Sequence, residues 1–237
     1  QYLQLRPGSA YGHRMLGYVN EKLGRTEPAR ESYRRAVELD PNGFNAQLFY
    51  AQFLGTHGDS DKARRILESL WQAGRSRGLV AIAMASLLGE RNEFSRCVEI
   101  LEEAARSEPR NAYLWQQMAA CRMRTQGPAA VVEPLTRAVE LWPERGAPRG
   151  SLARLLEKTG NPDEAEKHFR TLLDVEPDNP VVYYWLAEFL HKHRPDAAPE
   201  AFLIARKALD LPGPTSLPRE KIEQLIAEIQ GQTEPEV

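Results

Sequence analysis

Prolines recur along this chain at an interval of 34 residues, and this interval limits the possible folds more than any other feature. The members of the series are Pro7, Pro41, Pro109, Pro143 and Pro177, with Arg75 at the one remaining position. Because a proline pushes the preceding residue out of the helical region, each of them marks a helix end. Intervals of about 20 to 50 residues are typical of repeat proteins. The chain is therefore expected to be an array of similar units.

Other residue types follow the same interval. When units begin at residues 10, 44, 78, 112, 146 and 180, the seventh position is large and apolar and the eighth is small: Leu16-Gly17, Tyr50-Ala51, Met84-Ala85, Met118-Ala119, Leu152-Ala153 and Leu186-Ala187. Apolar residues recur at helical spacing on both sides of a central turn. A residue that tolerates the left-handed region lies in five of these turns: Gly24, Gly58, Asn92, Gly127 and Gly160. Each unit is therefore predicted to hold two antiparallel helices.

These landmarks resemble those of the tetratricopeptide repeat (TPR) family over residues 1 to about 215. The resemblance implies an all-α, right-handed superhelical solenoid of antiparallel helix pairs. Six full units are expected, at 10–43, 44–77, 78–111, 112–145, 146–179 and 180–215. Residues 1–9 are expected to end a truncated repeat, because Tyr2, Leu3 and Leu5 match the end of a second helix. We therefore expect the chain to be part of a longer array or protein.

Residues 216–231 are predicted to form a C-terminal capping helix, followed by a flexible tail at 232–237. Thr215 or Ser216 can cap this helix, and Pro218 suits its first turn. Its apolar residues form one stripe at helical spacing: Ile222, Leu225, Ile226 and Ile229. The stripe favours a helix that covers the last repeat, and a partner-binding amphipathic helix is the alternative.

Two units depart from the pattern. In the fourth unit, the turn glycine is displaced by one position and Pro128 follows it. Pro134 is expected inside the second helix of this unit, where it would bend the helix. The sixth unit fits only with two residues inserted near its turn, after which Ala201, Ala205 and Ala208 fall into place. Asn20 and Arg122 occupy positions where the family usually has a large apolar residue.

Composition and motifs argue against several functions. The net charge is −2 and no lysine or arginine run is present, so the sequence carries no nucleic-acid footprint. No apolar stretch is long enough to span a membrane, and the sequence assigns no compartment. No motif of a nucleophilic, metal-dependent or phosphate-binding enzyme is present. We therefore predict neither enzymatic activity nor a cofactor.

The cysteines and histidines are interpreted as structural. Cys97 and Cys121 are too few for a disulfide scaffold and occupy positions where the repeat requires small buried residues, so core packing is expected. His191 and His193 are two positions apart and would face different sides of a helix, so a shared metal site is not expected. No metal site is predicted.

The resemblance also implies a partner-binding groove, because the first helix of each TPR unit lines the concave face. The predicted groove residues lie at the second, fifth, sixth and ninth positions: Tyr11, Arg14, Met15, Tyr18, Asn45, Leu48, Phe49, Gln52, Tyr113, Gln116, Gln117, Arg154, Tyr184, Trp185 and Glu188. Two specialised versions of the family do not fit. The lysine and asparagine clamp of chaperone-binding TPR domains is missing, and so is the asparagine ladder of O-GlcNAc-transferase-type arrays.

The aromatic and apolar groove predicts a non-catalytic scaffold that binds a protein or peptide segment. Two alternatives remain open. The chain could be the TPR region of a larger enzyme or of a secretion or assembly machine, with its chemistry elsewhere. It could also associate with itself through an uncapped N-terminal end. The partner itself is not predicted, because a fold does not fix a function.

Overall fold

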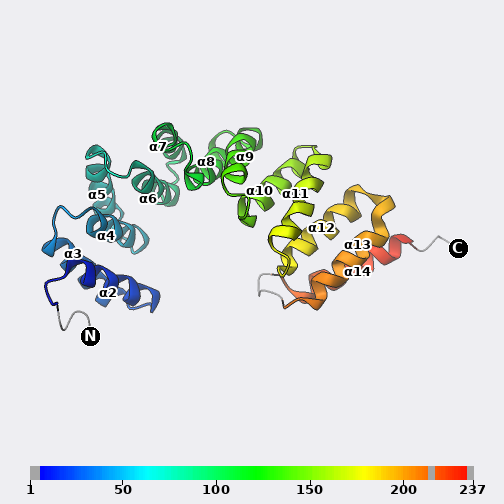
Figure 1. Cartoon of the computed structure of the whole chain (residues 1–237), viewed down its shortest axis with the longest axis horizontal. Helices are drawn as coiled ribbons and strands as arrows, with labels where there is room; N and C mark the ends of the chain where they lie inside the picture. The colour runs from blue at the N-terminus through cyan, green and yellow to red at the C-terminus, as the bar shows by residue number, and fades with distance from the viewer. Residues whose placement is uncertain (1–5, 213–216, 234–237) are drawn as a thin grey trace. The chain divides into compact units, whose positions relative to one another are not determined.

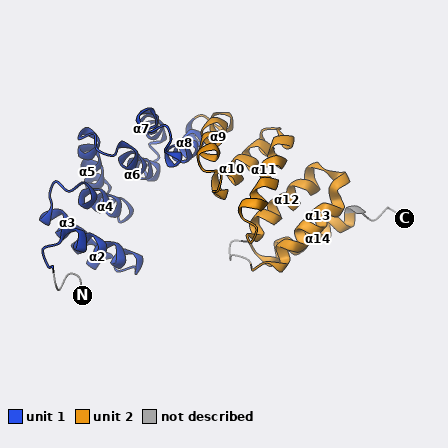
Figure 2. Ribbon diagram, in the orientation of Figure 1, with its two compact units in different colours: residues 1–125 blue, residues 126–237 orange. Residues whose placement is uncertain are grey.

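The computed structural model describes residues 6–212 and 217–233, and it is all-α over these ranges (Figure 1). No strand occurs within the described residues, so the predicted fold class is confirmed as an all-α repeat array. The predictions for Tyr2, Leu3, Leu5, Thr215, Ser216 and the end of the tail lie outside the described residues. The chain divides into two compact units, Gln1–Thr125 and Gln126–Val237 (Figure 2). The division falls inside the expected fourth repeat, beside the displaced Gly127.

Unit 1 consists of helix pairs in which each helix packs against the next along the chain. The first helices of neighbouring pairs also contact one another, α2 with α4, α4 with α6, and α6 with α8. The helices are α2 (Ala10–Lys22), α3 (Thr26–Leu39), α4 (Phe44–Thr56), α5 (Ser60–Gln72), α6 (Arg77–Glu90), α7 (Phe94–Ser107) and α8 (Ala112–Thr125).

Small residues at the eighth position allow the paired helices to approach closely. Gly17 lies in α2, and a Cβ added to it would lie 2.8 Å from the ring of Tyr33, a buried residue of α3. The turns also use the predicted left-handed residues, with φ of 69° at Gly24 and 60° at Asn92. These positions explain the repeat pattern, since a larger side chain would separate the helices or strain the turn.

The two cysteines correct the sequence-based interpretation. Cys97 in α7 and Cys121 in α8 are buried as expected, but a disulfide joins them, with their Cα atoms 6.2 Å apart. The bond crosses from one helix pair to the next, so it links neighbouring repeats. Core packing was predicted for each cysteine by itself. The two positions meet when adjacent units stack, which brings the two sulfur atoms together.

Unit 2 contains the proline-rich turn and the C-terminal helix. Its elements are η1 (Pro128–Val131), α9 (Val132–Leu141), α10 (Gly146–Lys158), α11 (Pro162–Val175), α12 (Pro180–His193), η2 (Pro195–Ala197), α13 (Ala198–Asp210) and α14 (Arg219–Thr233). The expectation that Pro134 bends a helix interior is wrong. A 3-10 segment precedes α9, so Pro134 lies in the first turn, where no intrahelical N–H is required.

The C-terminal helix α14 packs against α13 and contacts α12. Its four stripe residues are all buried: Ile222, Leu225, Ile226 and Ile229. The apolar side chains of the stripe are therefore buried within unit 2, and α14 covers the last repeat as the predicted cap does. The alternative that this stripe binds a partner is wrong.

Candidate partner-binding grooves

In unit 1, a guanidinium lies between two aromatic rings at the surface of the first helices. The Cζ of Arg14 is 4.6 Å from the ring centroid of Phe49 on α4 and 5.1 Å from that of Tyr11 on α2. On the same helix, the Nζ of Lys22 is 5.4 Å from the ring centroid of Tyr18. Cation–π contacts of this kind hold a charged group in place without neutralising it.

A second feature of unit 1 is a hollow of about 300 Å³ between α4, α6 and α8. Two of the predicted groove residues, Gln52 and Gln117, line it, together with three residues at the corresponding positions of the third unit: Ile82, Ala83 and Ser86. The small side chains of Ala83 and Ser86 leave the space open, while Gln52 and Gln117 supply amide donors and acceptors at its edge. The hollow can therefore take a small apolar side chain and bind backbone groups next to it.

The other predicted residues of unit 1 are distributed unevenly. Leu48 is only 3% exposed and belongs to the core, so its assignment to the groove is wrong. Leu48 is the fifth residue of its unit and is buried against neighbouring helices. Arg14 is the fifth residue of the preceding unit, and its side chain reaches the surface. Met15, Asn45 and Tyr113 are exposed, and Gln116 is partly buried.

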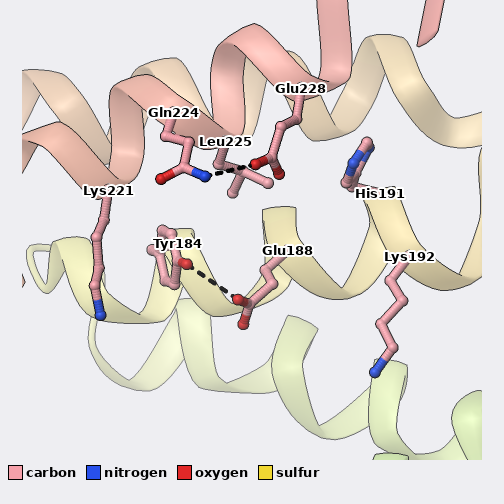
Figure 3. A pocket seen from close by; sticks show the side chains of 8 residues that line it. All are labelled: Tyr184, Glu188, His191, Lys192, Lys221, Gln224, Leu225 and Glu228. Atoms are coloured by element: carbon pink, nitrogen blue, oxygen red, sulfur yellow. Dashed lines mark hydrogen bonds between the residues drawn. The ribbon is translucent and has the colours of Figure 1, made fainter. Parts of the chain in front are cut away.

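In unit 2, α12 and α14 enclose a hollow of about 580 Å³ (Figure 3). The predicted groove residues Tyr184 and Glu188 line it from α12. The remaining lining residues were not predicted: His191, Lys192, Lys221, Gln224, Leu225 and Glu228. Four of these belong to α14. Both predictions for this helix, a cap or a partner-binding helix, rested on its apolar stripe, whereas the polar residues between the apolar positions form a second face that lines the hollow.

Two carboxylates face this hollow from opposite sides (Figure 3). The hydroxyl of Tyr184 donates to Glu188 Oε1 at 3.0 Å, and the amide of Gln224 donates to Glu228 Oε1 at 2.8 Å. Both donors are neutral, so they orient the carboxylates without removing their charge. Burial, together with Glu188 and Glu228, raises the pKa of Tyr184 to about 12. Tyr184 therefore remains a hydrogen-bond donor at neutral pH.

The basic side chains of α12 near the hollow, Lys192 and His191, have different surroundings. Lys192 donates to Glu157 Oε1 at 3.0 Å, and the same oxygen lies 3.0 Å from Nε2 of His193. Despite its burial, the pKa of Glu157 is lowered by these two partners. The Nδ1 of His191 is shielded from solvent and has no partner among the described residues. The hollow thus offers both hydrogen-bond donors and acceptors to a ligand.

The predicted Trp185 is a packing residue as much as a groove residue. Its ring lies over Gly150 of α10, where an added Cβ would be only 2.9 Å from the ring. The Cζ of Arg154 lies 5.3 Å from the Trp185 ring centroid. Trp185 therefore joins α10 to α12 and holds an arginine at the surface, as Phe49 does for Arg14.

Two further kinds of feature, a metal site and a membrane-spanning helix, are absent from the described part of the chain. Within 6–212 and 217–233, no group of three or more His, Cys, Asp or Glu side chains is placed to hold a metal ion. No helix in these ranges has both the length and the apolar character needed to cross a membrane.

Two curated proteins align with part of this chain. A probable biofilm formation methyltransferase, WspC of Pseudomonas putida, is 35% identical over 75 residues, which are 32% of this chain and 18% of WspC. The cytochrome c-type biogenesis protein CcmH of Escherichia coli is 31% identical over 112 residues, which are 46% of this chain and 32% of CcmH. The chain thus spans a third or less of the length of these relatives.

Solved structures share the fold over most of the chain. PilF of Pseudomonas aeruginosa has a TM-score of 0.68 at 18% identity, covering 92% of this chain and 97% of PilF. YrrB, described as a TPR protein with an unusual peptide-binding site, has a TM-score of 0.52 at 14% identity, covering 76% of this chain and 93% of YrrB.

Sequence models of the tetratricopeptide repeat match residues 10–42 in unit 1 and residues 147–189 in unit 2. The first match covers the helix pair α2 and α3, and the second covers α10, α11 and most of α12. With the 34-residue interval and the helix pairs of both units, these matches show that the chain belongs to the tetratricopeptide repeat family.

Proposed function

We propose that this chain is a non-catalytic scaffold that binds protein or peptide segments in the grooves formed by its first helices. TPR proteins are generally non-catalytic and bind proteins or peptides. The observation that carries the proposal is that a hollow opens along the first helices in each unit. In unit 1 it lies between the first helices α4, α6 and α8, and in unit 2 it lies between the first helix α12 and the capping helix α14.

The two hollows favour a peptide over a compact small molecule. Both are open at the surface and have amide or carboxylate groups along their edges, from Gln52 and Gln117 in unit 1 and from Glu188 and Gln224 in unit 2. An extended segment can bind such groups with its backbone and place alternate side chains in the hollow. The peptide-binding site named for YrrB supports the same kind of ligand.

Selection of random peptides by display on the whole chain tests the proposal. The variants Ser86→Trp and Gln224→Trp each place a large side chain at an exposed position that lines one hollow. Selected peptides should lose binding to one of the two variants by tenfold or more. The matched controls Ser95→Trp and Arg206→Trp alter exposed positions on second helices and should bind as the parent does. Failure to select any peptide, or equal binding by all variants, would contradict the proposal.

A second candidate is self-association through one side of α2. Leu16, Val19 and Leu23 are exposed by 40%, 47% and 59% on adjacent turns of this helix. An apolar strip of this size is the kind of surface that contacts another protein. Sedimentation velocity at several concentrations tests it, with Val19→Glu as the variant that should abolish any dimer. A monomer at all concentrations would exclude this function for the chain.

The alternative of a module within a larger enzyme or assembly machine is supported by the alignments with WspC and CcmH, which are both longer proteins. The complete gene product decides it. A product that contains only TPR units would contradict this alternative and leave the scaffold proposal in place.

A further inference from the structure

One face of α2 carries two cations that are each held by an aromatic ring. Tyr11, Arg14, Tyr18 and Lys22 follow one another at spacings of three, four and four residues, so they lie in one stripe along the helix. We call these four residues the α2 stripe. It is a different face from the apolar strip of Leu16, Val19 and Leu23. Phe49 of α4 completes the contact around Arg14.

The rings leave the binding groups of these cations available. An arginine that stacks on aromatic faces uses the flat side of its guanidinium, while its five N–H donors point outward in the plane. No hydrogen bond or ion pair from the Arg14 side chain occurs among the described residues, and the same is true of the Lys22 ammonium group. Both side chains are at least partly exposed. The stripe thus presents two oriented cations that have no carboxylate partner.

Few unpaired charges surround the α2 stripe. Besides Arg14 and Lys22, the first helices of unit 1 contain three arginines, and two of these, Arg77 and Arg122, form ion pairs with glutamates of α7. The helix α4, beside the stripe, has no charged residue at all. Glu21 is the one acidic residue on α2, and it accepts a hydrogen bond of 2.8 Å from the hydroxyl of Tyr33. An anionic ligand is therefore favoured on this side of unit 1.

We propose that the α2 stripe binds an acidic protein segment in extended conformation, with one carboxylate on Arg14 and a second on Lys22. This inference rests on the proposed scaffold function and names the chemistry of its partner. The carboxylate on Arg14 takes two N–H donors of the guanidinium, which is the planar arrangement that arginine prefers. The rings of Tyr11, Tyr18 and Phe49 hold the two cations in place and contact the apolar parts of the bound segment.

The separation of the cations sets the spacing of the acidic residues. Arg14 and Lys22 are eight residues apart, and a helix rises 1.5 Å per residue, so their Cα atoms are about 12 Å apart along the axis. An extended chain advances about 3.3 Å per residue and places alternate side chains on one side. Two carboxylates four positions apart therefore face the same side at about 13 Å and match the stripe.

A nucleic acid is a less suitable ligand for this surface. Non-specific binding of nucleic acids depends on many phosphate contacts, whereas the stripe supplies two cations and the chain as a whole carries a net charge of −2. A short single-stranded RNA is nevertheless the appropriate competitor in the test, because bases could stack on the exposed tyrosines.

Fluorescence anisotropy of the whole chain with defined probes tests the inference. The acidic probe is a labelled peptide, Gly-Ser-Glu-Leu-Ser-Leu-Glu-Ser-Gly, and the neutral probe replaces both glutamates by glutamine. A labelled oligoadenylate RNA of similar length is the third probe. The double variant Arg14→Gln with Lys22→Gln removes both charges and keeps the side-chain length close to the original. The control variant Arg65→Gln removes an exposed charge from the second helix α5.

The acidic peptide should bind the parent chain roughly tenfold or more tightly than the neutral peptide, since each charge-assisted contact contributes about a factor of ten. The double variant should lose this preference, and Arg65→Gln should keep it. Equal binding of the two peptides, an unchanged preference in the double variant, absence of binding by the acidic peptide, or stripe-dependent binding of the RNA alone would each overturn the inference.

The display experiment separates this inference from the proposed function. If the anisotropy test fails while selected peptides lose binding to Ser86→Trp or Gln224→Trp, the acidic partner is refuted and the scaffold function stands. A selection that yields no peptide would refute the scaffold function itself.

Discussion

Unit 1 and unit 2 use the same helix-pair template but differ in how their surfaces are completed. Unit 1 begins with α2, whose apolar residues Leu16, Val19 and Leu23 remain exposed, whereas unit 2 ends with α14, whose four apolar stripe residues are buried. Unit 1 has a disulfide across a repeat boundary. Both units also have ion pairs between repeats, formed by Arg91 with Asp61 in unit 1 and by Arg170 with Glu200 in unit 2.

Their grooves differ in charge as well. In unit 1, aromatic rings hold Arg14 and Lys22 and no acidic side chain is paired with them. In unit 2, neutral donors hold Glu188 and Glu228 at the wall of a larger hollow. Since the helices are alike, this difference arises from the few residues on the exposed face of each first helix. The fold supplies the positions, and the side chains at those positions set the charge of each groove.

The largest expected effect comes from weakening the cap of unit 2. The variant Ile229→Ala removes a side chain that is 1% exposed, and such a truncation costs about 3 to 4 kcal/mol of the free energy of unfolding. A truncation at the exposed Val19 of unit 1, Val19→Ala, should cost less than about 0.5 kcal/mol. Urea unfolding of both variants measures the contrast. Equal losses would show that the side chains of Ile229 and Val19 do not differ in burial.

Removing the disulfide should destabilise unit 1 by nearly as much. The bond joins residues 24 positions apart, and a closed loop of that length contributes about 3 kcal/mol through the unfolded state. In the variant Cys97→Ser with Cys121→Ser, hydrogen exchange should rise in α7 and α8 and stay unchanged in α11 to α14. The parent chain in denaturant should resist alkylation until a reductant is added. Two thiols that react without reductant would refute the bond.

A smaller contrast comes from two helical glycines. An added Cβ at Gly150 of unit 2 would lie 2.9 Å from the Trp185 ring, so Gly150→Ala should cost about 1 kcal/mol despite its better helix propensity. At Gly89 of unit 1 an added Cβ would meet no atom within 4 Å, so Gly89→Ala should stabilise by up to about 1 kcal/mol. Thermal unfolding of both variants provides the measurement. Stabilisation by both substitutions would exclude the close contact in unit 2.

The smallest expected effect concerns the pH dependence of unit 2. Burial, with the nearby charge of Arg149, lowers the pKa of His168 below its ordinary value of 6.5. The unfolded chain then binds more protons than the folded chain, so the stability of unit 2 should fall as the pH drops below about 6.5. His168→Gln should reduce this fall, by less than about 1 kcal/mol between pH 7.5 and pH 5.5. An identical pH dependence in the variant would show that other groups are responsible.

Much of the fold was predictable because the repeat imposes the same packing problem several times. The eighth position must be small wherever two helices touch, as at Gly17 against Tyr33, and the turn must tolerate positive φ, as at Gly24 and Asn92. Each landmark was therefore supported by its counterparts in other units. Pro134 was misjudged because its unit departs from the repeat, and no second copy indicated where α9 begins.

The site was less predictable because a groove position does not by itself determine exposure. Leu48 and Arg14 occupy the same position in neighbouring units, yet the former is buried and the latter reaches the surface. The contribution of α14 to the hollow in unit 2 was missed because both predictions for this helix, a cap or a partner-binding helix, rested on its apolar stripe and not on its polar face. Its polar face becomes relevant only when α14 is seen beside α12.

The sequence by itself determined the repeat interval, the helix pairs, the turns and the apolar stripe of the cap. These are local or periodic properties, and propensity and spacing within one unit decide them. The tertiary structure decided the rest: the Cys97–Cys121 disulfide, the burial of Leu48, the ring contacts of Arg14 and the carboxylates that face the hollow of unit 2. Each of these joins residues from different helix pairs. Such contacts depend on how the pairs stack, and no single stretch of the sequence contains that information.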